Sequence, residues 1–239
     1  MISLIIPAYN ENLIIENTLN ILYKYFSENF DNYEIIVVDD GSTDNMYNTV
    51  KNMIDKGYIS NTKIIHYKKN RGKGYAVRQG IIHSKGDYIF FTDADIAYGV
   101  TIIKKGYLKI KNSNSDVIIG SRKLAIDGYK NYPLKRYIAS RVFSFITSVI
   151  SNLSYDTQCG FKGFKKTVAK DIFKNCVIDR FAFDFEAMII AKKLDYKIIE
   201  IGVSVINHRE SKVNIFVDSI RMIKDIIKVK IITERRFRK

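Results

Sequence analysis

The chain is poor in residues that mark several common protein classes. Its 239 residues include no tryptophan, two prolines and two cysteines. The two cysteines, Cys159 and Cys176, form neither a zinc motif nor a disulfide framework, and such sparse use fits a reducing compartment. No stretch reaches the roughly 18 uninterrupted apolar residues of a membrane span. The first residues, Met1 to Pro7, lack the basic start and the length of a signal peptide, so we expect a first β-strand there.

Acidic residues are scarce over most of the chain, which carries a net charge of +14. They concentrate at the start, where residues 1–50 hold eight acidic side chains and one basic side chain, Lys24. The remaining chain is therefore strongly basic. A basic surface attracts nucleic acid, anionic membrane or phosphorylated substrates. No helix-turn-helix, zinc-finger or RNA-binding signature is present, so we expect no nucleic-acid partner.

The first half alternates β-rich runs with segments of helical periodicity. The runs at 3–6, 34–39, 63–67, 88–92 and 116–120 predict strands, and helical spacing marks 15–26, 49–54 and 75–82. This alternation predicts an α/β protein with a mostly parallel sheet flanked by helices. In such sheets, ligands bind beyond the carboxyl ends of the strands.

The second half is more helical. Apolar residues recur at helical spacing over 134–153 and from Val213 towards the C-terminus, which predicts amphipathic helices. A β-rich stretch at 160–164, a helix at 183–193 and a strand at 197–206 lie between them. We expect a single domain spanning residues 1–239.

Two carboxylates follow the predicted strand at 88–92. Asp93 and Asp95 flank the small residue Ala94, and both can face one ion if the chain turns there. Mg²⁺ is held by one or two carboxylates and completes its shell with water and substrate phosphates. Taken alone, such a tripeptide in a loop is usually solvated surface. Asp39 and Asp40 end the strand at 34–39 in a similar way, with ordinary Asp-Gly turn chemistry as the alternative.

Four motifs at these strand ends occur in a characteristic order. They are Pro7-Ala8-Tyr9-Asn10-Glu11, Val38-Asp39-Asp40-Gly41-Ser42-Thr43-Asp44, Asn70-Arg71-Gly72-Lys73-Gly74 and Thr92-Asp93-Ala94-Asp95. Together they resemble the nucleotide-sugar half of family 2 glycosyltransferases, which have the GT-A fold. The resemblance implies that this Rossmann-like half spans residues 1–97.

Three later motifs extend the resemblance over the whole chain. Gly120-Ser121-Arg122, the run from Asp156 to Lys162 and the run from Arg180 to Glu186 resemble the dolichyl-phosphate β-glucosyltransferase branch and, more distantly, the dolichol-phosphate mannose synthases. This resemblance implies an acceptor half over 98–212 and a basic amphipathic helix over 213–239. Eukaryotic glucosyl enzymes carry an N-terminal membrane anchor, which we do not expect here.

The resemblance implies an inverting, metal-dependent transfer of a hexose, glucose in the first place, from UDP-sugar to a polyprenyl monophosphate. UDP-N-acetylglucosamine or GDP-mannose as donor, or a non-enzymatic basic membrane-associated protein, are the alternatives. Asp93 and Asp95 would hold a divalent cation, Mg²⁺ or Mn²⁺. Ala97 replaces a glutamine that helps hold the metal in some mannose synthases, so the third ligand is left open. Asp184 would be a positioning group or weak base, or else a helix cap.

Donor and acceptor contacts are also implied by the resemblance. The nucleotide-sugar contacts would be Pro7, Tyr9, Glu11, Asp39, Lys73, Asp93, Ala94, Asp95 and Lys212. The acceptor phosphate would be bound by Arg122, Arg136 and Ser140. A phosphate monoester is largely dianionic at neutral pH. It therefore needs cationic partners more than a general base, and arginine suits phosphate oxygens well.

The lipid acceptor implies a place at a membrane. We expect a peripheral protein on the cytoplasmic face, held by the predicted amphipathic helices. Segment 213–239 carries eight basic and three acidic side chains, which suits an anionic lipid surface. Packing of these helices on the core or on a second subunit is the alternative. The oligomeric state is left open.

Overall fold

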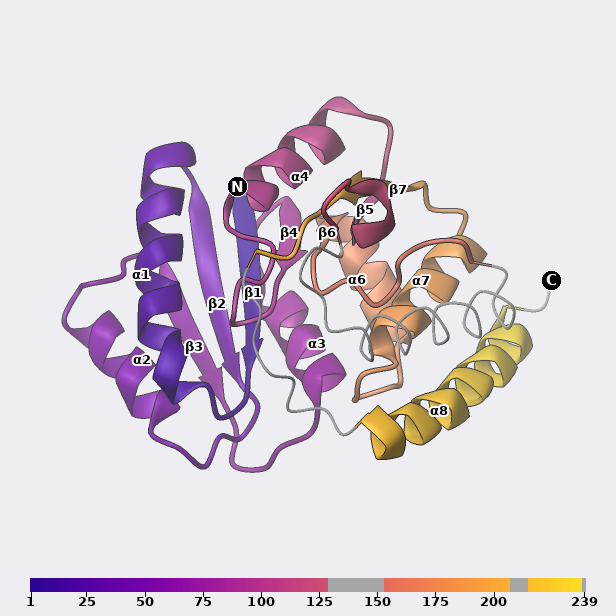
Figure 1. Ribbon diagram of the computed structural model, residues 1–239, viewed down its shortest axis with the longest axis horizontal. Coiled ribbons are helices and arrows are strands. Elements are labelled where there is room, and N and C mark those ends of the chain that lie inside the picture. Colours follow the sequence, from indigo (N-terminus) through magenta and orange to yellow (C-terminus); the bar gives the residue numbers. More distant parts are fainter. Residues whose placement is uncertain (129–152, 207–214, 238–239) are drawn as a thin grey trace.

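All strands that the structure describes belong to one sheet. This computed structural model describes residues 1–128, 153–206 and 215–237, with side chains of the last segment from residue 224 onward. Its seven strands lie in the order β3-β2-β1-β4-β6-β5-β7. Only β6 runs antiparallel to its neighbours, β4 and β5. The prediction of a mostly parallel α/β sheet is therefore confirmed (Figure 1).

The strands are β1 (Ile2–Ala8), β2 (Tyr33–Asp39), β3 (Thr62–His66), β4 (Tyr88–Phe91), β5 (Val117–Ser121), β6 (Lys162–Lys165) and β7 (Ile198–Gly202). The helices are α1 (Asn12–Asn29), α2 (Met46–Asp55), α3 (Lys73–His83), α4 (Thr101–Asn112), α6 (Lys166–Asn175), α7 (Phe183–Lys193) and α8 (Ile215–Arg236), with a short 3₁₀ turn at Arg122–Leu124.

The central strands read as continuous apolar runs because both faces of the sheet are covered. Every residue of β1 and β2 is buried. Such runs are typical of parallel strands between helical layers. In Figure 1, the first three strands run between α1 and α2 on one side and α3 on the other. Close packing on α3 needs a glycine, since a Cβ at Gly80 would lie 2.4 Å from Ile5.

Strand register brings the predicted motifs to one edge. Ala8 at the end of β1 pairs with Asp39 at the end of β2, and Asp39 pairs with His66 at the end of β3. On the other side, Ile5 of β1 pairs with Phe91, the last residue of β4. The segments that follow these strands therefore emerge side by side.

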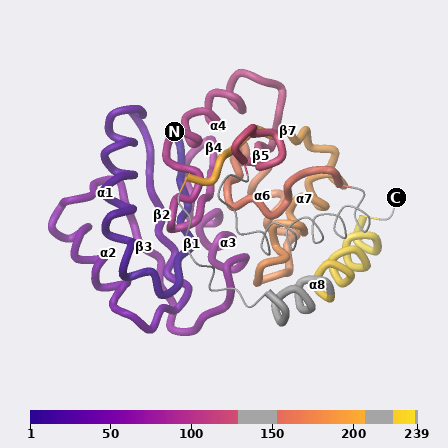
Figure 2. The backbone as a smooth tube through the Cα atoms, in the orientation of Figure 1, coloured from indigo at the N-terminus to yellow at the C-terminus, as the bar shows by residue number. Residues whose placement is uncertain are grey.

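Helix α8 lies at the opposite end of the molecule from α1 and α2 (Figures 1 and 2). Its residues Ile226, Val229 and Thr233 are buried, and the helix contacts α7. Arg236 donates a hydrogen bond to the carbonyl of Asn175, at the end of α6. Within the described part of the chain, no helix combines the length and apolarity of a membrane span.

Candidate active site

The segment after β4 makes the turn that the Asp-x-Asp motif requires. The amide of Ile96 donates to the carbonyl of Asp93 at 3.0 Å, and Ile96 has a φ of 42°. A β-branched residue rarely adopts this left-handed conformation, so the surrounding contacts must hold it there. One of them comes from α1, where Thr18 Oγ1 donates to the carbonyl of Ala94 at 2.7 Å. The sheet and α1 thus fix the backbone that carries both carboxylates.

Gly160, in the segment before β6, makes room for the first carboxylate. A Cβ built on Gly160 would lie 2.1 Å from Asp93 Oδ2. The carboxylate of Asp93 therefore packs directly on the backbone of the predicted acceptor half. No larger residue fits at this position without moving Asp93.

Lys73, at the start of α3, reaches the same carboxylate. Its Nζ lies 2.5 Å from Asp93 Oδ1. Burial alone would lower the pKa of Lys73, but the nearby carboxylates of Asp93 and Asp184 raise the pKa well above its ordinary value. The ammonium is therefore a permanent positive charge. It lies directly beside the Asp-x-Asp turn.

Asp95 is the second carboxylate of the turn. Burial, followed by the charge of Asp93, raises the pKa of Asp95, although the amide of Ala97 donates to its Oδ1 at 3.1 Å. Glu11 also contributes to this rise. A divalent cation would relieve this crowding of negative charge.

The donor set suits a cation that takes its remaining ligands from substrate. Over residues 1–128, 153–206 and 224–237, no three His, Cys, Asp or Glu side chains converge on one possible metal position. Mg²⁺ commonly binds one or two carboxylates and completes its octahedron with water and phosphate oxygens. Asp93 and Asp95 fit that requirement. Among the residues that the structure describes, no third protein ligand is evident.

Asp184 and Glu186, two residues apart on α7, bind different partners, because residues at this spacing do not share a helix face. Asp184 Oδ1 accepts a hydrogen bond from Lys162 Nζ at 2.5 Å. Burial raises the pKa of Asp184, while Lys162 and then Lys73 oppose the rise. Glu186 instead accepts the amides of Val177 and Ile178 at 2.9 and 2.8 Å. Asp184 makes no cap bond, because α7 begins after Ala182 without a side-chain cap.

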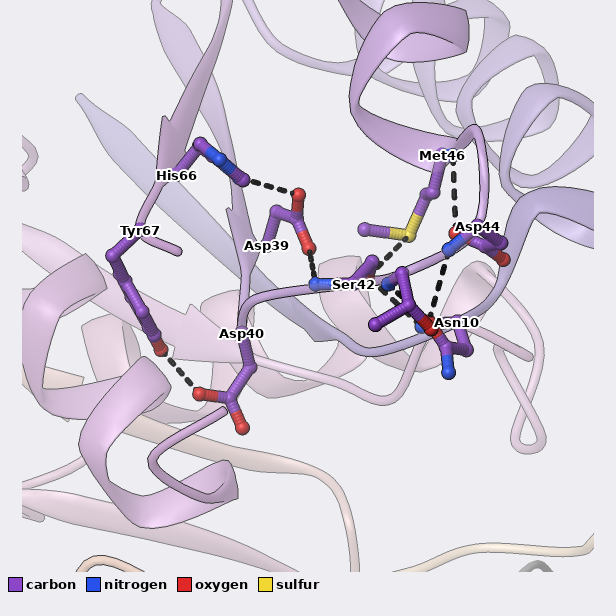
Figure 3. A network of polar contacts seen from close by, with 9 residues as sticks. Asn10, Asp39, Asp40, Ser42, Asp44, Met46, His66 and Tyr67 are labelled. Atoms are coloured by element: carbon purple, nitrogen blue, oxygen red, sulfur yellow. Dashed lines mark hydrogen bonds and ion pairs between the residues drawn. The ribbon is translucent and has the colours of Figure 1, made fainter. Parts of the chain in front are cut away.

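The two carboxylates that end β2 have different surroundings (Figure 3). Asp39 is fully buried, accepts the amide of Ser42 at 2.9 Å and is hydrogen-bonded to His66 Nδ1 at 2.8 Å. The ring of Tyr47 lies against His66, with centroids 4.5 Å apart. Asp39 therefore belongs to a cluster with a partly exposed imidazole, which suits the predicted contact with a nucleoside.

Asp40 instead organises the loop before α3. Its two oxygens accept hydrogen bonds from the Tyr67 hydroxyl, the Asn70 amide group and the backbone amides of Arg71 and Gly72, all within 2.9 Å. Gly72 has a φ of 107° and ends this loop immediately before Lys73. Asp40 thus contributes to the site indirectly, because it fixes the loop that positions Lys73 at the start of α3.

We expect Asp40→Asn to reduce the free energy of unfolding by about 1–3 kcal/mol, because Asp40 is buried and an amide in its place cannot accept from all four donors. Urea denaturation measures this loss. The control is Asp55→Asn, which removes an exposed partner of Lys51 and should change stability little. Equal stability of the two variants would contradict the structural role of Asp40.

Asn10 ties the first two loops of the site together (Figure 3). Its side-chain Oδ1 accepts a hydrogen bond from the backbone amide of Thr43 at 2.8 Å. The backbone amide of Asn10 donates to Ser42 Oγ at 2.9 Å. Asn10 has a φ of 55°, a conformation that asparagine tolerates better than most residues. The loop after β1 and the loop after β2 therefore form one surface.

The predicted nucleoside contacts lie along this surface. Pro7 is the penultimate residue of β1 and pairs with Val38. Tyr9 follows the strand and is 40% exposed. Glu11, at the N-cap of α1, is close enough to Asp95 to affect its pKa. The structure brings these residues to the edge that holds Asp93, and their roles stay predictions.

Arg122, at the end of β5, is buried against Asp156. Its Nε and Nη2 donate to the two oxygens of Asp156 at 2.9 and 2.7 Å, and its backbone amide donates to Oδ2. Burial alone would raise the pKa of Asp156, but Arg122 lowers it below the ordinary value. Burial raises the pKa of the nearby Tyr98 hydroxyl well above its ordinary value, while the charge of Arg122 opposes the rise.

Three predicted site residues lie outside the described residues: Arg136, Ser140 and Lys212. The remaining ones gather at one edge of the sheet. Several neighbours were not predicted, namely Gly160 and Lys162 around the carboxylates, Asp156 beside Arg122 and His66 beside Asp39. Three of these four stand within the run Asp156–Lys162, so the motif was visible although the individual roles were not.

The chain belongs to glycosyl transferase family 2, whose family model matches residues 3–173. The chain is therefore a glycosyltransferase, and the resemblance drawn from its motifs is confirmed.

Individual curated relatives align with both the nucleotide-sugar half and the acceptor half of this chain. The dolichyl-phosphate beta-glucosyltransferase of Dictyostelium discoideum is 35% identical over 96% of this chain and 73% of its own length. That of Saccharomyces cerevisiae is 34% identical over 95% and 73%, and that of Mus musculus is 31% identical over 96% and 75%.

Solved structures share the fold. Glucosyl-3-phosphoglycerate synthase from Mycobacterium tuberculosis, in complex with phosphoglyceric acid, superposes with a TM-score of 0.70. The match covers 96% of this chain and 79% of that chain at 16% sequence identity. At this identity the likeness concerns the fold alone, and it confirms the GT-A prediction.

Proposed function

We propose that this chain transfers glucose from UDP-glucose to a polyprenyl monophosphate of the dolichyl type, with inversion at the sugar carbon. An oxygen of the lipid phosphate forms a bond to C1 while the bond from C1 to the diphosphate breaks, and UDP leaves. The observation that carries this proposal is the similarity to dolichyl-phosphate beta-glucosyltransferases, which extends over 96% of the chain.

The donor side would hold the diphosphate with a divalent cation and Lys73. Relatives in fold have been solved with Mn²⁺ and UDP-glucose, and with Mg²⁺ and UDP. Here Asp93 and Asp95 would hold the cation, which when bound offsets the negative charge that develops on the leaving diphosphate. The ammonium of Lys73 lies next to Asp93 and can contribute a second positive charge.

The acceptor side would be built around Arg122. Asp156 orients its guanidinium from the buried side. Two buried polar atoms near this pair in sequence, Ser121 Oγ and Gln158 Nε2, have no hydrogen-bond partner in the part of the chain that the structure describes. Buried donors are normally paired, so both suit a site that takes a polar group such as phosphate.

The test is transfer of radiolabel from UDP-[¹⁴C]glucose to organic-extractable lipid in the presence of dolichyl phosphate and Mn²⁺ or Mg²⁺. GDP-mannose and UDP-N-acetylglucosamine are the matched donors. We expect label in the lipid fraction from UDP-glucose above all, and none without lipid phosphate. Lipid labelling from GDP-mannose alone would overturn the choice of donor.

We also propose that the protein works at the cytoplasmic surface of a membrane, with α8 against the lipid. Helix α8 has a second apolar face besides the one buried on α7. Ile227 and Ile231, one turn apart, are 48% and 46% exposed. Lys224, Lys228 and Arg235 are exposed on the same helix. Apolar side chains flanked by cations are typical of helices that lie in the membrane interface.

We expect the protein to float with vesicles of phosphatidylcholine and phosphatidylserine, and the bound fraction to fall with added salt. Each cation near anionic lipid contributes about 1 kcal/mol, and salt screens this attraction. Ile227→Ser with Ile231→Ser should reduce flotation without loss of the fold, because both side chains are exposed. The matched control replaces Leu13 and Ile82, which are 90% and 57% exposed elsewhere. Equal flotation of both double variants would contradict attachment through α8.

A further inference from the structure

Lys162 is a fully buried cation that the donor and acceptor assignments do not use. It is the first residue of β6 and has no exposed surface. Its Nζ donates to the carbonyl of Cys159 at 2.7 Å and to Asp184 Oδ1 at 2.5 Å. The face of the Phe91 ring lies 5.3 Å away. Every partner of this ammonium is therefore internal.

Stability alone does not account for a charge in this position. The neighbours Phe91, Phe161 and Phe164 are all buried aromatic residues. Desolvating an ion pair costs about as much as its attraction returns, and apolar pairs of similar volume are often as stable or more stable. The pair must therefore be considered for what it does to Asp184.

Asp184 is the partner of this buried cation and lies near Lys73, whose Nζ is 5.9 Å from the ring centroid of the adjacent Phe183. Its charge interacts with Lys73 and with Asp93, the residues that meet at 2.5 Å next to the Asp-x-Asp turn. Lys162 binds one carboxylate oxygen, Oδ1, from the side of the core. The other oxygen, Oδ2, makes no hydrogen bond with any residue that the structure describes. A carboxylate held by one oxygen has a defined orientation and leaves the second oxygen for substrate.

We propose that Lys162 is a positioning residue that orients Asp184 for sugar transfer. It touches no substrate and acts through Asp184 alone. The carbonyl of Cys159 fixes the ammonium, the ammonium fixes Asp184, and Asp184 faces the charges that hold the donor. The inference rests on the proposed function only for the identity of the substrates.

The test compares Lys162→Met, Asp184→Asn and the double variant with the wild-type chain. Lys165→Met is the matched control, because Lys165 ends the same strand and pairs with Asp116 away from the site. Measurements are kcat for lipid glucosylation, the rate of UDP release from UDP-glucose without acceptor, the Kd for UDP with Mn²⁺, and the melting temperature.

We expect Lys162→Met to lower kcat at least about tenfold with the Kd for UDP nearly unchanged, as for other residues that support a reactive group. The double variant should be no slower than the slower single variant, because both changes remove one interaction. Lys165→Met should keep wild-type kcat. If Lys162→Met does not fold, Lys162→Gln keeps one hydrogen bond to Asp184 without the charge, and the same losses are expected.

A folded Lys162 variant with wild-type kcat would overturn the inference. So would losses that multiply in the double variant, an equal loss in UDP affinity, or failure of both Lys162 variants to fold. If the wild-type chain labels no lipid, the proposed function fails by itself. The inference is then decided by the same comparison on UDP release.

Discussion

Asp95→Asn is expected to lower turnover by about 10²- to 10³-fold while leaving the fold intact. Asp95 is one of two carboxylates on a turn whose backbone is fixed by Thr18 and by the end of β4. An amide has nearly the same shape, so the turn should persist. The variant loses a negative charge that would hold the cation, and transition-state charge then loses its partner. Steady-state transfer of glucose to lipid phosphate measures the effect.

Mn²⁺ titration together with the melting temperature distinguishes loss of metal binding in this variant from loss of the fold. Asp95→Asn should bind Mn²⁺ more weakly in the presence of UDP, and its melting temperature should stay close to that of the wild type. Asp44→Asn is a suitable control, because Asp44 lies on the neighbouring loop and contacts the amides of Asn12 and Met46. Full activity of Asp95→Asn, or of the wild type in EDTA, would rule out metal dependence.

The second large effect is expected from Gly160→Ala. The added methyl group would lie 2.1 Å from Asp93 Oδ2, which is the end of a side chain and can swing away. The protein should therefore fold, and Asp93 should leave its position. A displacement of about 1 Å can cost on the order of 10² in rate. We expect a loss of that size in turnover, weaker Mn²⁺ binding and a small change in melting temperature.

Gly163→Ala is the matched control for this variant. Its Cβ would also meet an atom at 2.1 Å, but that atom belongs to the buried ring of Phe90, which cannot move aside cheaply. This variant should lose stability, and its folded fraction should keep its activity per molecule. If Gly160→Ala instead behaved like Gly163→Ala, the glycine would serve packing and not the carboxylate.

Much of the fold was predictable because periodicity and burial agree. The stripe of α1 is an example, since Ile15, Leu19, Leu22 and Phe26 are all fully buried. Helices α4 and α6 were not predicted, although Ile102, Ile103, Gly106 and Ile110 of α4 recur at helical spacing. Interspersed lysines obscured this periodicity. Their charged ends reach solvent or, as with Lys104 and Asn29, a neighbouring helix.

Only those site residues that directly follow a predicted strand could be placed in the site from the sequence. Asp39, Asp93 and Asp95 follow apolar runs, and parallel strands bring such ends together. Asp39 was predicted as a nucleotide-sugar contact and Asp40 was not, and the structure shows Asp40 bound to the loop at 70–72. The contacts made by Gly160 and Lys162 were not predictable, because they depend on β6 lying antiparallel between β4 and β5. No local sequence pattern predicts which strands a given strand will pair with in a sheet.

The place of β6 also restricts how the molecule can move. It joins β4, which leads to the donor carboxylates, to β5, which leads to Arg122. Asp93, Asp95 and Arg122 consequently follow strands of one continuous sheet, and a hinge between the two halves would have to break the hydrogen bonds between β4 and β6. A motion that rocks the two halves against each other as separate bodies would therefore not leave the sheet intact. Rates of substrate entry and product departure should then not depend on such a motion.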